Sequence, residues 1–217
     1  MRTIKSLLLV CGFALIAQLG FGQISGTKHD FSAAAWNATT EICIVCHTPH
    51  NADITVAEAP LWNHETTATA TFTLYNTGTF NGSGTIGQPD GSSKLCLSCH
   101  DGITAVDAYG TVGGVPVTTG QNMTTLIPGS DAGFGTDLTN DHPISFTYNT
   151  ALATADGELY DPATQPALGG TIDTKMLFAG QMECASCHDV HNKAVAGTKM
   201  LHIDNAGSQL CLTCHNK

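Results

Sequence analysis

Cys184-Ala-Ser-Cys187-His188 is one of four short stretches that decide how this 217-residue chain folds. Each stretch has two cysteines separated by two residues, with a histidine directly after the second cysteine. The other three are Cys43-Ile-Val-Cys46-His47, Cys96-Leu-Ser-Cys99-His100 and Cys211-Leu-Thr-Cys214-His215. Together the four stretches use eight of the nine cysteines, so the pattern leaves no pair for a disulfide framework.

This spacing predicts covalent attachment of c-type haem. Two thiols about one helical turn apart can reach the two vinyl groups of a haem, and the adjoining histidine then reaches the iron from the same side. Zinc sites and redox dithiols also use paired cysteines, but a dithiol does not require the following histidine. The sequence therefore predicts four covalently bound haem c groups, anchored by the eight cysteines and ligated by His47, His100, His188 and His215.

The composition agrees with a core that is filled by a cofactor. Only 12% of the residues are charged and 6% are aromatic, whereas an average soluble domain has roughly 25% charged residues. The 23 glycines and the frequent threonines leave few large apolar side chains for a core made of protein alone. We therefore expect a multihaem cytochrome fold that is mostly coil, with short helices at the CxxCH motifs, few or no strands and a haem-filled core.

The charge balance excludes one class of partner and predicts another kind of ligand. The chain has only eight Lys and Arg residues and 18 Asp and Glu residues, so it has no basic surface for a nucleic acid. Four haems would add eight propionates, which so few cationic side chains cannot pair. We expect backbone N–H groups, water and divalent cations at carboxylate clusters to neutralise them.

The first 22 residues predict a secretory signal peptide. Arg2 and Lys5 give it a positively charged start, an apolar run from Leu7 to Leu19 follows, and small residues precede a cleavage site before Gln23. The apolar run is shorter than the roughly 20 residues that span a bilayer. We therefore expect the protein to be exported through the periplasm, to the outer cell surface or the extracellular space.

The remaining residues, 23–217, are predicted to form a single tetrahaem domain built from two dihaem units. The units cover about residues 23–108 and 140–217, and a haem-free, loop-rich stretch joins them. The first and third motifs both continue as CxxCHxxHN, and the second and fourth both follow a Gly-Ser segment that ends in leucine. Haem pairs should therefore recur in a similar geometry and form a chain rather than a cluster.

Each haem iron also needs a distal ligand, and the histidines outside the motifs are the candidates. They are His29, His50, His64, His142, His191 and His202, of which His202 is the least favoured. His50 and His191 lie three residues past a motif histidine, too close to return to their own haem, so each is expected to ligate a different haem. His142, His29 and His64 complete the predicted set. Only four distal places exist, and whether His29 or His64 is the spare histidine stays open.

Bis-histidine ligation would leave no coordination place for a substrate, so the sequence predicts outer-sphere electron transfer and not an enzyme. Asp141 is expected to fix the ring of His142 by accepting its second N–H. The less favoured alternative is a multihaem reductase of oxyanions, which would need an open iron and cationic residues that guide an anion. The surplus of histidines and the excess of acidic residues both argue against it.

The motifs and their flanks, among them Lys28-His29-Asp30-Phe31-Ser32 and Pro60-Leu61-Trp62-Asn63-His64, resemble those of multihaem c-type cytochromes with doubled CxxCH motifs. More narrowly, the chain is similar to the OmcE-like tetrahaem subunits of extracellular cytochrome filaments. This resemblance implies that identical subunits stack head to tail, with His50 of one subunit ligating the last haem, at His215, of its neighbour. It also implies redox partner cytochromes and extracellular acceptors such as metal oxides. The same flanks are shared by monomeric periplasmic or cell-surface shuttle cytochromes, which is the alternative function.

Overall fold

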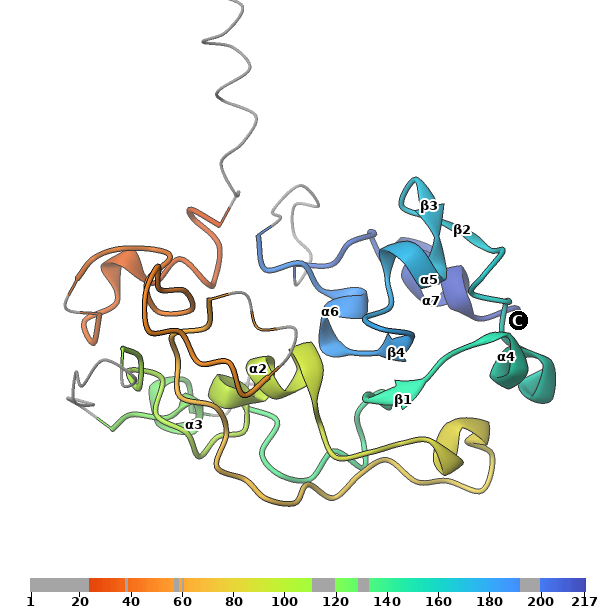
Figure 1. Cartoon of the computed structure of the whole chain (residues 1–217), viewed down its shortest axis with the longest axis horizontal. Coiled ribbons are helices and arrows are strands. Elements are labelled where there is room, and N and C mark those ends of the chain that lie inside the picture. The colour runs from red at the N-terminus through yellow and green to blue at the C-terminus, as the bar shows by residue number, and fades with distance from the viewer. Residues whose placement is uncertain are drawn as a thin grey trace, which may run out of the picture.

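The computed structural model describes residues 24–37, 39–56, 59, 61–110, 120–128, 133–191 and 200–217 (Figure 1). The predicted signal peptide, residues 1–22, lies outside the described residues. So does much of the stretch that was predicted to join the two dihaem units. The helices, strands and clusters of the fold are those of the described residues alone.

Most of the described chain is coil, as the sequence predicted, and its helices are short. The longest is α2 (Gly91–His100), which contains the second CxxCH motif. The others are α3 (Met123–Leu126), α4 (Thr150–Asp156), α5 (Ile172–Lys175), α6 (Cys184–Cys187) and α7 (Gln209–Cys214), with 3-10 turns η2 (Phe31–Ala33), η3 (Asn81–Gly84) and η5 (Ala206–Ser208). In α4 the limits are set by the sequence, because the Asn149 side chain accepts the Leu152 N–H at the start and Gly157 ends the helix with a positive φ of 76°.

Two small antiparallel strand pairs lie in the C-terminal half. In the first pair, β1 (Phe146–Thr147) bonds to β4 (Gln181–Met182), with Phe146 opposite Met182. In the second, β2 (Pro166–Ala167) bonds to β3 (Gly170–Thr171). Each strand has two residues, so these pairs fix the path of the loops without forming a sheet of ordinary size.

The apolar side chains form separate small clusters. The largest lies in the C-terminal half and consists of Phe146, Tyr148, Ala153, Ala167, Ile172, Met176, Met182 and Leu210. Two clusters of three buried residues each include α2: one contains Val56, Trp62 and Leu95, and the other contains Phe72, Leu97 and Leu138. The protein core is therefore uneven, and the N-terminal half has much less of it.

The motif helices follow one another across the molecule. In Figure 1 the orange N-terminal segment and α2 lie on the left, α6 lies near the middle and α7 lies on the right. Contacts between α2 and α6 join the two halves. The helices of the second, third and fourth motifs, α2, α6 and α7, thus follow one another along the long axis of the molecule in their sequence order.

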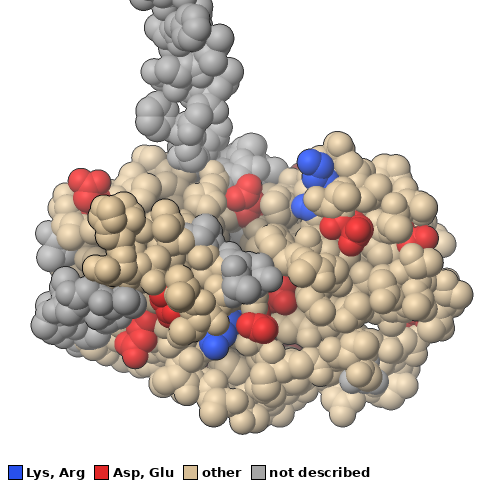
Figure 2. Space-filling model, viewed as in Figure 1, with Lys and Arg blue, Asp and Glu red and all other residues tan. Residues whose placement is uncertain are grey.

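Few charged side chains interrupt the visible surface. On the face shown in Figure 2, acidic side chains are scattered and basic ones are fewer, with no basic patch. Among the described helices, none combines the length and the apolar character needed to cross a bilayer.

Candidate haem sites

Each CxxCH motif forms about one helical turn. The backbone N–H of the motif histidine donates to the carbonyl of the first cysteine in three of them, with N···O distances of 2.9 Å for His47, 3.1 Å for His188 and 2.9 Å for His215. In the remaining motif, α2 runs to its histidine, His100. A single turn brings the two thiols to the same side of the backbone, which is the arrangement that two thioether bonds to one haem require.

The second and third motifs are in direct contact. The Cys96 and Cys184 thiols are close enough to interact, and this interaction lowers the pKa of Cys184 and raises that of Cys96. The Ser93 hydroxyl on α2 accepts the N–H of Cys184 at 2.9 Å. The side chain of Glu183, at the start of α6, accepts the N–H of Ser93 at 3.2 Å. These contacts fix the relative placement of the two candidate haem anchors.

The other consecutive motifs are also neighbours. Burial raises the pKa of the Cys99 thiol, and the Cys46 thiol of the first motif is close enough to raise it further. Burial likewise raises the pKa of Cys187 to about 11, with a contribution from Cys211 of the fourth motif. Successive pairs of cysteines therefore form a row in which each motif lies next to the following one.

Three of the motif histidines have a second histidine ring facing them. The ring centroids are 6.0 Å apart for His47 and His191, 6.1 Å for His100 and His29, and 6.4 Å for His215 and His142. The planes of the last two pairs meet at similar angles, 71° and 75°, whereas those of His47 and His191 are nearly parallel at 21°.

These separations fit two imidazoles that share one metal ion. A metal–nitrogen bond is about 2 Å long and the centre of an imidazole lies about 1.1 Å behind its nitrogen, so two rings on opposite sides of a metal have centroids about 6 Å apart. Rings in direct T-shaped contact also have centroids about 4.5–7 Å apart, so the distances agree with a shared iron and the CxxCH motifs supply the argument for one. The residues therefore fit haem iron at three of the four motifs, with His191, His29 and His142 as candidate distal ligands.

The hydrogen bonds of His29 and His142 involve Nδ1 and leave Nε2 of each ring to bind iron. Nδ1 of His142 is 2.9 Å from the carbonyl oxygen of Pro143, and Nδ1 of His29 is 2.9 Å from the sulfur of Met200. A ligand histidine commonly donates its other N–H to such a partner, which fixes the tautomer and leaves Nε2 for the metal. The expected partner of His142 was Asp141, and in the structure the Pro143 carbonyl takes that part.

Burial of His29 also favours the form that binds metals. Its pKa is lowered to about 4, mainly by burial and then by His100, His188 and His191 nearby. The pKa of His215 is lowered for the same reasons, burial first and then His142. Both rings are therefore neutral at neutral pH, and the neutral imidazole is the ligand.

His64 and His202 are held in a different way. His64 is buried with Nδ1 2.8 Å from the Glu65 carbonyl oxygen and Nε2 3.2 Å from that of Val106. Nε2 of His202 lies 3.0 Å from the carbonyl oxygen of Ala185. The ring of His64 contacts Trp62 and its Nε2 lies 3.5 Å from Cys99 Sγ, whereas the ring of His29 faces the motif histidine His100. His29 is therefore the better candidate where the sequence left His29 and His64 open.

His50 is exposed, and its local structure matches that of His191. The backbone N–H of His50 donates to the Thr48 hydroxyl at 3.4 Å, and that of His191 donates to the Asp189 carboxylate at 3.0 Å. Thr48 and Asp189 occupy the same place in the two CxxCHxxHN stretches, directly after the motif histidine. The same turn therefore presents both histidines.

At each of these two motifs a later segment of the backbone bonds to the motif, and this arrangement is also repeated. The N–H of Thr48 donates to the Leu61 carbonyl at 2.9 Å, and the N–H of Asn63 donates to the Cys46 carbonyl at 2.9 Å. Trp62, between them, pairs with His47 in an antiparallel bridge. We call this returning segment, residues 61–63, the first clamp.

A second clamp, residues 200–202, has the same bonds at the third motif. The N–H of Asp189 donates to the Met200 carbonyl at 2.7 Å, the N–H of His202 donates to the Cys187 carbonyl at 2.9 Å, and Leu201 pairs with His188. Leu61 and Met200 both have a positive φ, 54° and 57°. His202 thus stands where the first clamp has Asn63, whose side-chain amide donates to Ile44. The dihaem repeat of the sequence extends to backbone geometry at positions whose residue types differ.

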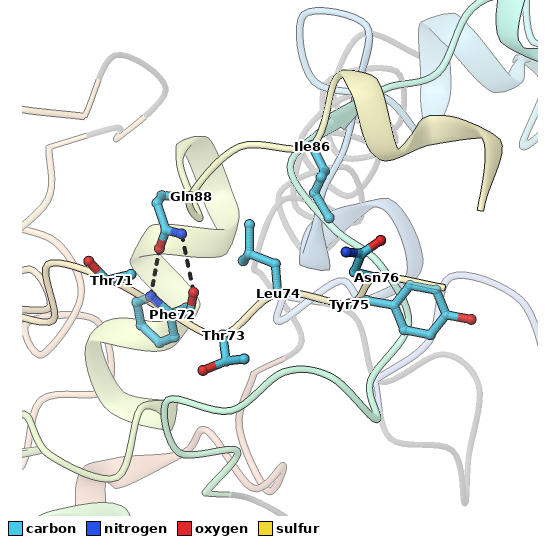
Figure 3. Close-up of a pocket in the computed structure, with 8 residues that line it drawn as sticks. All are labelled: Thr71, Phe72, Thr73, Leu74, Tyr75, Asn76, Ile86 and Gln88. Carbon is cyan, nitrogen blue, oxygen red and sulfur yellow. Dashed lines mark hydrogen bonds between the residues drawn. The ribbon is translucent and has the colours of Figure 1, made fainter. Parts of the chain in front are cut away.

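A pocket of about 690 Å³ lies apart from the motifs, between residues 71–76 and 86–88 (Figure 3). The Gln88 side chain holds the two segments together, since it accepts the Phe72 N–H at 2.6 Å and donates to the Phe72 carbonyl at 3.2 Å. Leu74 and Ile86 extend into the space between them in Figure 3. None of the eight lining residues is Cys, His or charged, so this pocket does not favour the oxyanion reductase alternative.

The predicted divalent-cation sites gain no support from the part of the chain that the structure describes. There, no group of three or more His, Cys, Asp or Glu side chains is arranged to hold a metal ion. The histidine pairs are consistent with this finding, because the porphyrin supplies the other four ligands of a haem iron.

Comparison with known families supports the same interpretation of the motifs. Residues 177–217, which include the third and fourth motifs, match the family model of the doubled CXXCH motif. No curated protein matches the chain at a significant level. The family match supports a multihaem c-type cytochrome with covalently bound haem c, and thus an electron carrier.

Proposed function

We propose that the protein carries electrons by outer-sphere transfer through four bis-histidine c-type haems, as the repeating subunit of an extracellular filament. The observation that carries this proposal is the repeat of histidine pairs and clamps across the two halves of the chain. Bound haem supplies one-electron exchange between ferric and ferrous iron. The chain anchors the haems through thioethers, orients them through the histidine rings and keeps solvent away from them.

The repeat suggests a ligand for each motif. His29 precedes the first motif and faces the second motif histidine, His100. In the same way, His142 precedes the third motif and faces the fourth, His215. The similar ring angles, 71° and 75°, support the same role, that of distal ligand, for His29 and His142 in the two units.

The same logic gives His50 a partner in a second copy of the chain. His191 belongs to the third motif and faces His47, in the unit that precedes it along the chain. His50 is the equivalent of His191 in the first unit, so the unit that precedes it belongs to another subunit. There, the equivalent of His47 is His188. We therefore propose that His50 ligates the third haem, at His188, of the neighbouring subunit.

This assignment differs from the one that the family resemblance implied. The resemblance placed His50 on the last haem, at His215. The ring of His142 lies 6.4 Å from that of His215, which supports a ligand from the same chain for the last haem.

The row of motifs supports a continuous path for electrons. Cys46 lies near Cys99, Cys96 lies near Cys184, and Cys187 lies near Cys211. An electron that enters at the first haem would pass the second and third to reach the fourth. Export by the signal peptide and delivery to redox partner cytochromes or metal oxides are part of the proposal, and they depend on the sequence alone.

Assembly of a His50→Ala variant tests the filament. The variant should load four haems, because the anchors are intact, but it should stay monomeric in light scattering and form no filaments in electron micrographs. The control is His202→Asn, which places in the second clamp the residue that the first clamp has at Asn63. This control should assemble like the natural chain.

Two results would contradict the proposal. If the natural chain is monomeric at every concentration tested, the monomeric shuttle replaces the filament subunit. If His50→Ala assembles normally, His50 is not the bridging ligand. Haem counting by mass spectrometry on the same samples checks the electron-carrier part separately, because fewer than four attached haems would break the proposed path.

A further inference from the structure

The cysteines of successive motifs approach one another in an alternating way. Within each unit, the second cysteines of the two motifs lie close together, and these pairs are Cys46 with Cys99 and Cys187 with Cys214. Between the units, the first cysteines lie close together, Cys96 with Cys184. Continued past the end of the chain, the same alternation leads from the first cysteine of the fourth motif, Cys211, to Cys43 of another copy.

Cys43 and Cys211 are placed for such a contact. Of the eight motif cysteines these two are exposed, whereas the other six are partly covered. In Figure 1 the orange N-terminal segment and α7 lie at opposite ends of the long axis of the molecule. Each end of the molecule therefore presents one side of the contact that Cys96 and Cys184 make in its middle.

A second contact between the units gives the same result. The sulfur of Met200, at the start of the second clamp, lies 2.9 Å from Nδ1 of His29 in the first unit. Leu61 is the equivalent of Met200 in the first clamp, and His142 is the equivalent of His29 in the second unit. Leu61 is 55% exposed and His142 is also exposed, so both sides of this contact again lie at the surface of the single chain.

We propose that the first motif and first clamp of one subunit lie against α7 and His142 of its neighbour, so that Cys43 meets Cys211 and Leu61 covers the His142 ring. The partner is a second copy of this chain. The two surfaces lie at opposite ends of the molecule, so the interface is heterologous, as an open filament requires. This inference rests on the proposed filament and names the surfaces that hold it together.

One placement of the neighbour produces all of these contacts. The arrangement of the second unit on the first brings His191 to His47, Cys184 to Cys96 and Met200 to His29. If the first unit of one subunit takes the same place on the second unit of another, the corresponding pairs are His50 with His188, Cys43 with Cys211 and Leu61 with His142. The proposed bridging ligand and the proposed surface are therefore compatible.

The surface at the first clamp is apolar. Ile54 is 87% exposed, and it follows Asp53, whose N–H donates to the Trp62 carbonyl of the clamp. Ile42 stands before Cys43, where the third motif has Glu183 before Cys184. The carboxylate that accepts from Ser93 in the middle of the molecule thus has an apolar replacement at the end, and burial of apolar side chains would drive this contact.

Oxidation of natural filaments by hydroxyl radicals, with the modified residues identified by mass spectrometry, tests the surface. Leu61 and Ile103 have similar exposure in the single chain, 55% and 59%, and similar chemistry, so Ile103 is the internal reference. In the filament Leu61 should be oxidised roughly fivefold less than Ile103, because residues in the core of an interface are shielded from water. In dissociated subunits the two should be oxidised to a similar extent.

Variants give an independent measurement. Leu61→Asp should load four low-spin haems and should need a protein concentration at least about tenfold higher to form filaments. Leu61→Met, which introduces the residue of the second clamp, should assemble like the natural chain. Ile103→Asp is the matched control for the added charge and should also assemble normally.

The results separate this inference from the proposed function. Filaments in which Leu61 and Ile103 are oxidised equally would overturn the proposed surface and leave the filament intact, and this measurement needs no variant to fold. Assembly of Leu61→Asp at the same concentration as Ile103→Asp would also overturn the surface. A natural chain that forms no filaments would instead contradict the proposed function.

Discussion

The imidazole rings of His47 and His191 are nearly parallel, with 21° between their planes and 6.0 Å between their centroids, although one belongs to the first motif and the other follows the third. The segment that carries His191 therefore completes a site that begins in the N-terminal half. The two halves are joined by this pair as well as by the contact of α2 with α6.

Replacing His191 by alanine should open one haem iron. We expect one of the four haems to change from low-spin to high-spin ferric iron in a magnetic-resonance spectrum, and added imidazole to restore it. His202→Asn is the control and should stay low-spin throughout, because the His202 ring bonds to the Ala185 carbonyl. Four low-spin haems in His191→Ala would exclude His191 as a ligand.

His29→Met and His142→Met should each raise the midpoint potential of one haem, because methionine as an axial ligand favours ferrous iron. The two variants should behave alike, since the rings they replace face His100 and His215 at similar distances and angles. A potentiometric titration followed by absorbance measures this. His64→Gln is the discriminating control: unchanged ligation there is expected, and a high-spin haem would show that His64, and not His29, is the ligand.

Glu183 should make stability fall as the pH rises. Burial raises its pKa above the ordinary value of 4.5, Asp90 adds to the rise, and hydrogen bonds from Ser93 and Ser145 oppose it. The folded state therefore holds this proton more tightly than the unfolded state does. Stability is present below the unfolded pKa and is lost as the pH passes through the folded pKa.

Glu183→Gln removes this titration and keeps an oxygen that can accept from Ser93. At neutral pH its free energy of unfolding should exceed that of the natural chain by something on the order of 1 kcal/mol, and the difference should vanish toward pH 4. Denaturant titrations at several pH values measure it. Glu158→Gln is the control, because Glu158 forms an exposed ion pair with Lys217 and should show little of this trend. A variant that is less stable than the natural chain at neutral pH would show that the ionised carboxylate is stabilising.

Asp101→Ala should destabilise the loop after the second motif. Asp101 is 1% exposed, and its carboxylate accepts from the N–H groups of Ile103 and Thr104 and from the hydroxyls of Thr104 and Thr67. Leaving these donors without an acceptor should cost about 2–4 kcal/mol in denaturant titrations. Asp204→Ala is the control, since Asp204 is exposed and accepts from Ala206, and its cost should be much smaller. Equal costs would mean that water replaces the carboxylate of Asp101.

The motifs and the coil-rich fold could be predicted because they depend on local spacing. Cys184, Cys187 and His188 lie within five consecutive residues, so their geometry follows from one helical turn. The partner of each motif histidine could be predicted only as a set of candidates. The choice between His29 and His64 depends on which ring faces a motif histidine, and that depends on the fold that brings His29 to the distant His100.

The two clamps could not be predicted for a further reason. Trp62 corresponds to Leu201 and Asn63 to His202, and pairs of such different side chains give no repeat that can be seen in the sequence. The feature that repeats is the backbone bonding to Cys46 and Cys187, which many side chains permit.

The uneven core constrains the order of events during maturation. The large cluster around Tyr148 and Ile172 holds the C-terminal half together with protein side chains alone, and Cys187 and Cys214 pack against it. Burial raises the pKa of Cys214 to about 12, so in the folded chain this thiol is neutral and a poor nucleophile. An attachment enzyme would then have to reach these two cysteines before the cluster consolidates, and burial likewise raises the pKa of Cys46 and Cys99 in the N-terminal half. In each pair that contains an exposed cysteine, Cys43 or Cys211, the second thiol is thus the one that must react before folding is complete.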